Sequence, residues 1–375
     1  MFDDVDLLIA GAGPVGCVIA AQAARTLGWR VLIVEKRRHI AGNCYDRYHE
    51  SGVFVHEYGP HYFRTNNKGL IDYLSQYTEW IPGNYIVKSA TRGKLFPFPI
   101  NLDTLSQFYD KELTAEDARA LLDSVRSPID NPSNSEEFVL SRVGRELYEA
   151  FYLGYTLKQW DRHPRELDAS VCGRIPVRFN HDSRYVDQQY QLMPADGYTT
   201  LFTRMIDHPG IHVMLDTDYK DVAGAIAPSR ATVYTGPIDH YFDYCFGPLP
   251  WRSLTFDWKT YDQEYVQPCV QINYPNDHAY TRSVEIKHVT RQIHPKTVVT
   301  YEYPCASGDP YYPVPARENT ALYTRYKELA DAERRERRVY FLGRLANYVY
   351  MNTDEAIERA LQTFEVIRQD CFRPR

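Results

Sequence analysis

The sequence predicts an α/β protein that opens with a dinucleotide-binding unit. Its first 35 residues supply three observations. An apolar run of strand length, Val5 to Ala10, leads directly into the turn Gly11-Ala12-Gly13-Pro14-Val15-Gly16, which has the spacing G-x-G-x-x-G. An Ala-rich helical stretch extends to Leu27, and a second apolar strand, Val31 to Val34, ends at Glu35. In this order, such a turn binds the pyrophosphate of a dinucleotide.

The residue types in this unit each have a physical reason. The first glycine permits the tight turn, the second lets the backbone approach a pyrophosphate, and the third lets the helix pack on the strand. The N-terminus of the helix then presents free N–H groups to the phosphates. Glu35 stands where a carboxylate accepts ribose hydroxyls. We expect cofactor contacts from Gly11, Gly13, Pro14, Val15, Gly16, Glu35 and Lys36.

The glycine turn alone leaves NAD and FAD open, and the segment that follows favours FAD. Ala41-Gly42-Asn43 forms a second glycine-containing turn, which is expected to close on an extended cofactor. The segment His56-Glu57-Tyr58-Gly59-Pro60-His61 then places a histidine, His61, against that cofactor. Gly42, Asn43 and His61 therefore join the predicted cofactor site.

Composition excludes several function classes. The net charge is −6 and the sequence has no long basic run, so nucleic acid is not an expected partner. The uncharged stretch Leu7–Ala24 is interrupted by three glycines and a proline, and acidic Asp3-Asp4 precedes it, so we expect neither a membrane span nor a signal peptide, but a cytoplasmic protein. The seven cysteines show no C-x-x-C pair, so neither a metal site nor a disulfide framework is indicated.

The order of element types predicts three parts. The cofactor domain is discontinuous and comprises residues 1–78, 196–238 and 317–375, because the N- and C-terminal parts are expected to complete one sheet. Residues 101–170 have a helical pattern and form an inserted helical lobe. Residues 79–100, 171–195 and 239–316 form an antiparallel β-sheet domain, in which residues 174–190 are strand-like.

Aromatic and arginine-rich segments mark a second site. They include Gly59-Pro60-His61, Tyr155-Thr156-Leu157-Lys158-Gln159-Trp160, Arg174-Ile175-Pro176-Val177-Arg178, Thr281-Arg282, Pro310-Tyr311-Tyr312-Pro313 and Gly343-Arg344-Leu345. In this order, from end to end, they resemble the motifs of the flavin-dependent UDP-galactopyranose mutases. The resemblance covers nearly the whole chain. It implies a Rossmann-like FAD domain, a helical lobe and an antiparallel sheet, with the active site where the three meet.

The resemblance also implies a role for individual residues. Arg174 and Arg282 hold the substrate diphosphate and, with His61 near the flavin, make up the catalytic set. Tyr155 stacks on the uracil beside Phe151 and Tyr152, and Trp160 borders the sugar. The hydroxyls of Tyr185, Tyr312 and Tyr350 bind phosphate oxygens. Gly343, Arg344 and Met351 complete the FAD site, with Arg344 on the FAD pyrophosphate. Guanidinium groups suit a diphosphate because they form paired, charge-assisted hydrogen bonds.

The implied reaction is the redox-neutral conversion of a UDP-galactopyranose to the furanose, with reduced flavin N5 as the nucleophile and a flavin–sugar adduct on the pathway. A homodimer is a further implication of the resemblance. Two alternatives stay open. One is a flavin oxidoreductase of the amine oxidase type, and the other is a nucleotide-sugar-binding flavoprotein without catalysis.

Three positions depart from the family pattern, all around the ligand. Arg64 replaces a histidine, Val186 replaces an aromatic residue near the base, and Asn352 replaces an acid. They bear on the identity of the sugar and of the base. Because a guanidinium offers five donors on a long stem, Arg64 could reach an acetamido carbonyl, so UDP-N-acetylgalactosamine is a candidate substrate beside UDP-galactose.

Overall fold

The cofactor domain is built on a five-stranded parallel sheet of segments far apart in the sequence. The computed structural model describes residues 4–173 and 175–372. The strand order is β10 (Ile211–Met214), β2 (Val31–Val34), β1 (Leu7–Ala10), β11 (Ala231–Tyr234) and β17 (Val339–Phe341). Every pair is parallel. This confirms the α/β fold and the joining of N- and C-terminal segments in one sheet.

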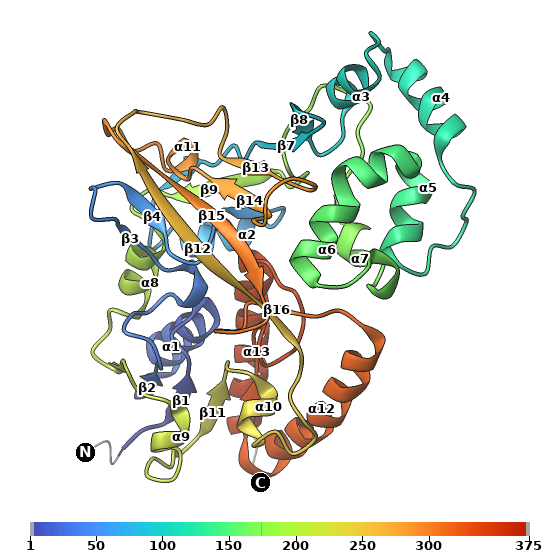
Figure 1. Ribbon diagram of the computed structural model, residues 1–375. Helices are drawn as coiled ribbons and strands as arrows, with labels where there is room; N and C mark the ends of the chain where they lie inside the picture. Colours follow the sequence, from blue (N-terminus) through green and yellow to red (C-terminus); the bar gives the residue numbers. More distant parts are fainter. Residues whose placement is uncertain (1–3, 174, 373–375) are drawn as a thin grey trace.

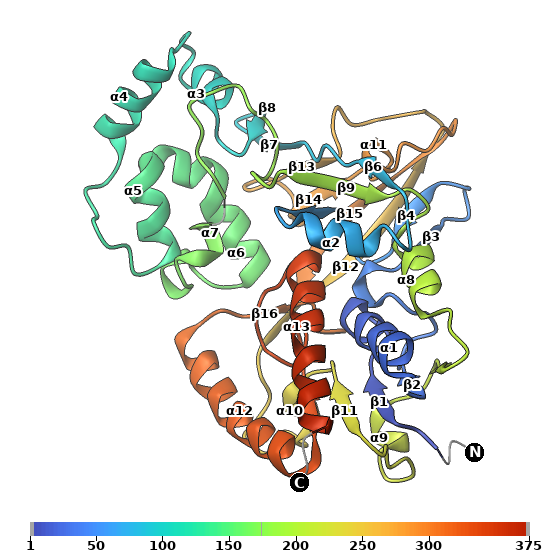
Figure 2. The ribbon, with the colours of Figure 1, turned by 180° about the vertical axis from the view of Figure 1, so that it is seen from behind.

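Alternate side chains of the central strands enter two separate cores, because successive residues of a strand point to opposite faces. Leu7, Ile9, Val31 and Ile33 lie in the main core, where α1 (Pro14–Leu27) packs against α13 (Thr353–Phe372) and α8 (Tyr198–Ile206) (Figure 2). Leu8, Ala10, Leu32 and Val34 face a smaller core near α9 (Tyr219–Val222) and α10 (Ile238–Tyr241). Burial on both faces is typical of parallel strands.

The first helix begins and ends where the sequence predicts. Pro14 occupies its first turn, and Gly28 at its C-cap adopts the left-handed conformation at φ 65°. The Gly28 N–H donates back to carbonyls of the last turn, Ala23 and Ala24. Pro at the start and Gly at the end satisfy the free backbone groups of a helix at little conformational cost.

The second sheet has seven strands in the order β16-β12-β15-β14-β13-β7-β8. Its bounds are Tyr312–Pro313, Trp251–Tyr261, Thr297–Cys305, Arg282–Val284, Gln271–Asn273, Val87–Thr91 and Lys94–Phe98. The prediction of an antiparallel sheet is confirmed for five of the pairs but wrong for one, because β13 runs parallel to β7. The long ribbon of β12 and β15 crosses the molecule diagonally in Figure 1.

The strand-like reading of residues 174–190 is wrong for the described residues 175–189, which are irregular apart from one bridge between Ile86 and Arg184. A strand begins only at Tyr190. This strand, β9 (Tyr190–Pro194), lies between β5 (Phe63–Thr65) and β6 (Trp80–Pro82) in a small sheet of its own. A hairpin of β3 (Asp46–Tyr48) and β4 (Phe54–His56) and the short helices α2 (Lys68–Leu74) and α11 (Lys287–Thr290) complete this region.

The helical lobe stands apart from the cofactor domain, to one side of the seven-stranded sheet (Figure 1). It contains α3 (Leu102–Tyr109), α4 (Ala115–Val125), α5 (Ser135–Tyr148), α6 (Gly154–Trp160) and α7 (Ser170–Gly173). Capping explains the helix starts: Asn101, Thr114 and Asn134 each accept a backbone N–H of the first turn. Helix α12 (Arg317–Arg337) returns the chain to the cofactor domain. Among the described residues, no helix is both long and apolar enough to cross a membrane.

Gly16→Ala should destabilise the cofactor domain. A Cβ at position 16 would lie 2.0 Å from the carbonyl oxygen of Gly11, so turn and helix would have to separate. Overpacking of this kind costs about 1–3 kcal/mol. Thermal unfolding should show a lower Tm for G16A. Gly224→Ala is the matched control because a Cβ there meets nothing within 4 Å, and an equal Tm for both variants would contradict the role of Gly16.

Candidate active site

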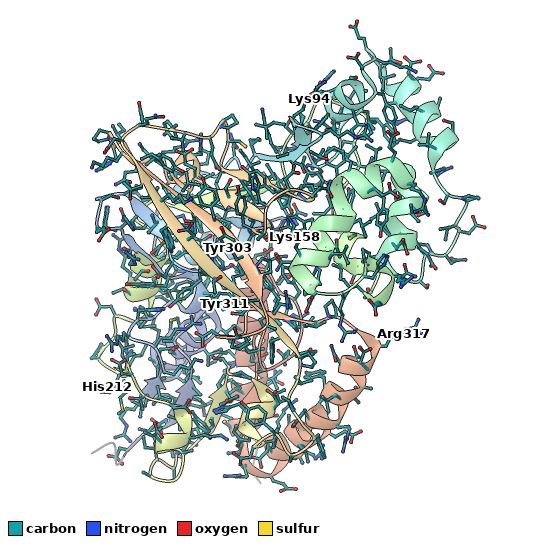
Figure 3. All side chains as sticks on the ribbon, in the orientation of Figure 1. Lys94, Lys158, His212, Tyr303, Tyr311 and Arg317 are labelled. Carbon is teal, nitrogen blue, oxygen red and sulfur yellow. The ribbon has the colours of Figure 1, made fainter. Side chains whose placement is uncertain are left out.

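One cavity of about 1370 Å³ lies where the three parts meet. The loop before β5 and β5 itself contribute His61 and Arg64, the lobe contributes Trp160, and β14 contributes Arg282. Further wall residues are Tyr185, Tyr312, Arg344 and Tyr350, together with Asn43. In Figure 3, two other wall residues, Tyr311 and Arg317, mark its side toward β16 and α12. The cavity thus brings together nine residues that the sequence assigns to cofactor or substrate.

The glycine turns form a backbone cradle at the N-terminus of α1. Gly11 has φ 109°, and a Cβ there would lie 2.0 Å from the Thr235 hydroxyl oxygen. A Cβ on Gly42 would lie 3.0 Å from the Cα of Gly13, so the two turns touch through their backbones. Gly13 is the N-cap of α1 and adds no side-chain cap, which leaves first-turn N–H groups to an external acceptor. This is a cradle that fits a pyrophosphate.

Glu35 closes the cradle at the end of β2. It is 6% exposed, and its carboxylate oxygens accept the backbone N–H groups of Ala12 at 2.8 Å and Arg37 at 2.9 Å. The Lys36 side chain points elsewhere and pairs with Asp309 at 3.1 Å. Asn43 lines the cavity, and its side-chain oxygen accepts from Arg37 Nη1 at 2.9 Å. Glu35 and Asn43 are thus fixed at the edge of the cradle.

Arg344 follows β17, the last strand of the cofactor sheet, and lines the cavity. Gly343 has φ 108°, and a Cβ at this position would lie 3.7 Å from Cγ2 of Val15. Arg344 donates to the carbonyl oxygens of Tyr311 at 3.2 Å and Met351 at 2.7 Å. Met351 is 2% exposed, so its carbonyl rather than its side chain takes part in this corner.

Arg282 is locked in place by a buried carboxylate. Its Nε donates to Glu302 Oε2 at 2.6 Å, and Glu302 is fully buried. The two residues stand opposite each other on the neighbouring strands β14 and β15. Burial alone would lower the pKa of Arg282, but Glu302 and nearby tyrosine hydroxyls hold that pKa well above its usual range. The guanidinium is therefore a permanent cation beside the cavity.

The turn before β5 packs directly on this ion pair. Gly59 has φ 84°, and a Cβ there would lie 3.2 Å from Glu302 Oε1. His61 follows two residues later, and its Nδ1 donates to the Gly59 carbonyl oxygen at 3.0 Å, because a carbonyl can only accept. In the neutral ring, Nε2 of His61 is consequently an acceptor.

Both histidines of this segment are neutral. Nδ1 of His56 accepts the backbone N–H of His61 at 3.1 Å, so its proton resides on Nε2. Burial lowers the pKa of His56 to about 3. Burial, assisted by His56, Arg344 and Arg282, also lowers the pKa of His61 to about 3. His61 cannot act as a cation near neutral pH.

Aromatic side chains form the wall opposite the cradle. Trp160 contacts Tyr312 edge to face at 6.2 Å between ring centroids, and Tyr312 stacks with Tyr350 at 6.1 Å. Tyr155 lies on α6 close enough to Arg282 and Tyr185 to interact with them electrostatically, and burial raises its pKa. Four of the aromatic residues that the sequence assigns to the substrate, Trp160, Tyr185, Tyr312 and Tyr350, therefore line the cavity, while Tyr155 lies beside Arg282 and Tyr185 without being part of the lining.

Phe151 and Tyr152 lie behind this wall. Phe151 is 3% exposed, and its ring contacts Phe96, Phe98 and Phe108. Tyr152 is 7% exposed and contacts Phe98. Both residues belong to the core that the lobe shares with β8, so in this structure they support the uracil position predicted for Tyr155 rather than line the cavity.

Two cations tie α6, and with it this wall, to the seven-stranded sheet. Nζ of Lys158, which Figure 3 shows at the junction of lobe and sheet, has four carbonyl oxygens of the β13–β14 loop within reach of its three N–H donors, those of Tyr274, Asp277, His278 and Tyr280. Buried Arg252 on β12 donates to the carbonyl oxygens of Gln159 and Lys158 at 3.0 and 3.2 Å. These bonds fix Tyr155 and Trp160 relative to Arg282.

Two departures from the family pattern contact each other. Arg64 Nη2 donates to Asn352 Oδ1 at 2.7 Å across 288 residues of sequence. Val186, the third departure, is 6% exposed and lies at the cavity wall. Arg174 lies outside the described residues. Within the described residues 4–173 and 175–372, no group of three or more His, Cys, Asp or Glu side chains could hold a metal ion.

Comparisons with known proteins agree with this site. The UDP-galactopyranose mutase family profile matches residues 150–350, and an NAD(P)-binding Rossmann-like domain profile matches residues 9–77. A probable UDP-galactopyranose mutase from Klebsiella pneumoniae is 40% identical over 370 residues, covering 96% of this chain and 93% of that protein. The chain belongs to the UDP-galactopyranose mutase family. It is thus an isomerase by family.

A further relative and two solved structures are also similar to this chain. A dTDP-fucopyranose mutase from Escherichia coli is 36% identical and covers 95% of this chain and 96% of that protein. The fold matches a crystal structure of reduced UDP-galactopyranose mutase with a TM-score of 0.73 at 14% identity, covering 98% and 96% of the two chains. A putrescine oxidase structure also shares the fold, with a TM-score of 0.56 at 12% identity and coverage of 97% and 99%.

The family resemblance in the sequence is thereby confirmed, while the individual residue roles stay predictions. Sequence reasoning missed Glu302 as the partner of Arg282. It also missed the ring stack of Tyr62 on Tyr85, 4.3 Å between centroids, in the cavity wall. Opposite charges on neighbouring strands often pair, so Glu302 could have been predicted as the partner of Arg282 if the pairing of β14 with β15 had been known.

His56 and His61 should contribute to the loss of folding stability of this protein at low pH. An unfolded histidine takes up a proton below about pH 6.5, whereas these two stay neutral down to about pH 3. The unfolded state therefore binds more protons in this window, and stability falls as the pH is lowered from 6.5 toward 3, by up to about 1.4 kcal/mol per pH unit for each histidine.

The variant His56→Asn tests this component, because its side-chain oxygen can still accept the His61 N–H. Tm measured between pH 7 and pH 4 should fall less steeply for H56N than for the parent. Parallel curves for the two proteins would show that His56 is charged in the folded state.

Proposed function

We propose that this protein is an FAD-dependent mutase that interconverts UDP-galactopyranose and UDP-galactofuranose without net oxidation. The observation that carries the proposal is the single cavity in which neutral His61 and Arg344, beside the cofactor cradle, meet Arg282 and the tyrosine hydroxyls. Family membership supports it. Incubation of the reduced protein with a panel of nucleotide sugars, with furanose product as the readout, tests it directly.

FAD fits the cradle described above. The turns at Gly11–Gly16 and Gly42-Asn43, with Gly343-Arg344, would hold its pyrophosphate, and Glu35 its ribose. Bound and reduced, the flavin would supply through N5 the nucleophile for the anomeric carbon of the sugar. Flavoenzymes such as putrescine oxidase among the structural neighbours support this choice of cofactor.

The protein residues would bind and orient the substrate. Arg282 and Arg174 hold the diphosphate, and the hydroxyls of Tyr185, Tyr312 and Tyr350 donate to its oxygens. Tyr155 stacks on the base, supported by Phe151 and Tyr152, and Trp160 borders the sugar. This grip keeps UDP in place after the glycosidic bond breaks, so that the ring-contracted sugar recombines with the same nucleotide. Nε2 of His61, an acceptor, would face the cofactor.

The substrate panel should vary both the base and the sugar. UDP-N-acetylgalactosamine belongs in it because Arg64 lines the cavity, and dTDP-fucose because one relative is named for that reaction. The alternative of an oxidoreductase predicts consumption of oxygen or NAD(P), and a binding protein without catalysis predicts no product. A cytoplasmic location and a homodimer are further parts of this proposal.

Turnover should require the reduced flavin, because N5 is a nucleophilic amine nitrogen only in that state and an electron-poor imine nitrogen in the oxidised flavin. The purified protein should be yellow, and product formation from UDP-galactose should appear after reduction with dithionite under anaerobic conditions. Equal turnover by the oxidised and reduced protein would refute this mechanism.

Arg282→Ala and Arg174→Ala should each lose turnover, and because R282A leaves buried Glu302 without its cation, turnover is compared only for protein whose Tm and flavin content show that it is folded. A hydrogen bond to a charged group contributes about 1.5–3 kcal/mol, which corresponds to a factor of roughly ten to one hundred. The kcat/KM of the reduced variants is the measurement, with flavin absorbance as the control for cofactor retention. Near-normal kcat/KM in both would place the diphosphate elsewhere.

A further inference from the structure

Arg64 is a cation in the cavity wall whose closest partner is an amide. It lies in the middle of β5 and is half-buried. Besides Nη2 on Asn352, its Nη1 donates to the Tyr62 hydroxyl at 3.4 Å. Among the residues that the structure describes, Arg64 forms no ion pair with a carboxylate. Asp354 acts on it only at longer range, and burial raises the pKa of that carboxyl to about 6.

Asn352 is itself held in one orientation. Its backbone N–H and its side-chain Nδ2 donate to Glu355 Oε2 at 2.7 and 3.3 Å. The amide nitrogen is therefore turned toward Glu355 and the amide oxygen toward Arg64. A carboxylate at position 352 would form an ion pair with the guanidinium, whereas the amide positions the guanidinium without an ion pair.

The surroundings of Arg64 are those expected for a diphosphate. Its guanidinium lies over the Tyr62 ring at 5.5 Å from the centroid. The Tyr62 hydroxyl is close enough to Tyr185 and Tyr350 to interact with both electrostatically, and these are two of the three hydroxyls assigned above to phosphate oxygens. Arg282, by contrast, already has Glu302 at 2.6 Å, so its charge is largely balanced before a ligand binds.

We propose that Arg64, positioned by Asn352, binds the diphosphate of the nucleotide substrate. This inference rests on the proposed function and moves the guanidinium from the sugar, where the sequence placed it, to the leaving group. Arg64 retains N–H groups beyond those bonded to Asn352 and Tyr62, and a guanidinium binds phosphate oxygens with charge-assisted bonds. Asn352 acts through Arg64 and is a positioning residue.

Binding of UDP and of uridine to the oxidised, FAD-loaded full-length protein separates the diphosphate from the rest of the substrate. Arg64→Met should raise the Kd of UDP by about 10–100-fold, the value of one or two charged hydrogen bonds, and leave the Kd of uridine unchanged in isothermal titration calorimetry. Asn352→Asp should weaken UDP binding in the same direction, because it neutralises the guanidinium without removing it. Arg368→Met changes the net charge equally at the far end of α13 and should alter neither Kd.

The outcomes distinguish this inference from the proposed function. A parent protein that binds neither UDP nor dTDP would overturn both. If the parent binds UDP and R64M or N352D, each with normal FAD content and Tm, binds it equally well, only the role of Arg64 is overturned. An unchanged UDP Kd with a shifted ratio of kcat/KM for UDP-N-acetylgalactosamine and UDP-galactose would return Arg64 to the sugar.

Discussion

The buried ion pair between Arg282 and Glu302 is the interaction on which the site depends. Glu302 is fully buried, and removal of either partner from such a pair leaves an uncompensated charge in a dry environment, which is far more costly than the pair itself is stabilising. The pair lies across β14 and β15, and the Gly59 turn packs on it. His61 follows the Gly59 turn by two residues, so the contact of this turn with the charge pair also positions His61.

Local signals in the sequence were sufficient for the cofactor domain. The β1–α1–β2 unit is specified within 35 consecutive residues by glycine spacing, apolar runs and a C-cap, so its order and most of its bounds could be read directly, although β1 begins at Leu7 and not at Val5. The seven-stranded sheet carries no such local information where β13 runs parallel to β7, because residues 271–273 and 87–91 are brought together only by the completed fold. Alternation of apolar and polar residues shows that a strand exists, but it does not identify its neighbour or direction.

In the candidate site, too, contiguous motifs could be predicted from the sequence, whereas contacts between distant residues could not. Motifs such as Gly59-Pro60-His61 and Gly343-Arg344 could be identified because each is contiguous, and the structure brings them to one cavity. Partnerships between distant positions could not: Glu302 is 20 residues from Arg282, and Asn352 is 288 residues from Arg64. Phe151 shows a third limit, since an aromatic residue in a motif can serve the core of the lobe as well as the ligand. The domain boundaries drawn from the sequence remain predictions.

The cavity is assembled from parts that lie on different elements, and the relatives of this chain include mutases named for different nucleotides and sugars. Trp160 and Tyr155 are placed by α6, which Lys158 and Arg252 bond to the seven-stranded sheet, whereas Tyr312 and Tyr350 lie against Arg344. The corner of Arg64 and Asn352 is set by β5 and the start of α13. Arg282 and Glu302 lie opposite each other on the neighbouring strands β14 and β15. If Arg64 binds the diphosphate as proposed, a substitution at the corner would change ligand binding without a change in the cofactor cradle or in Arg282.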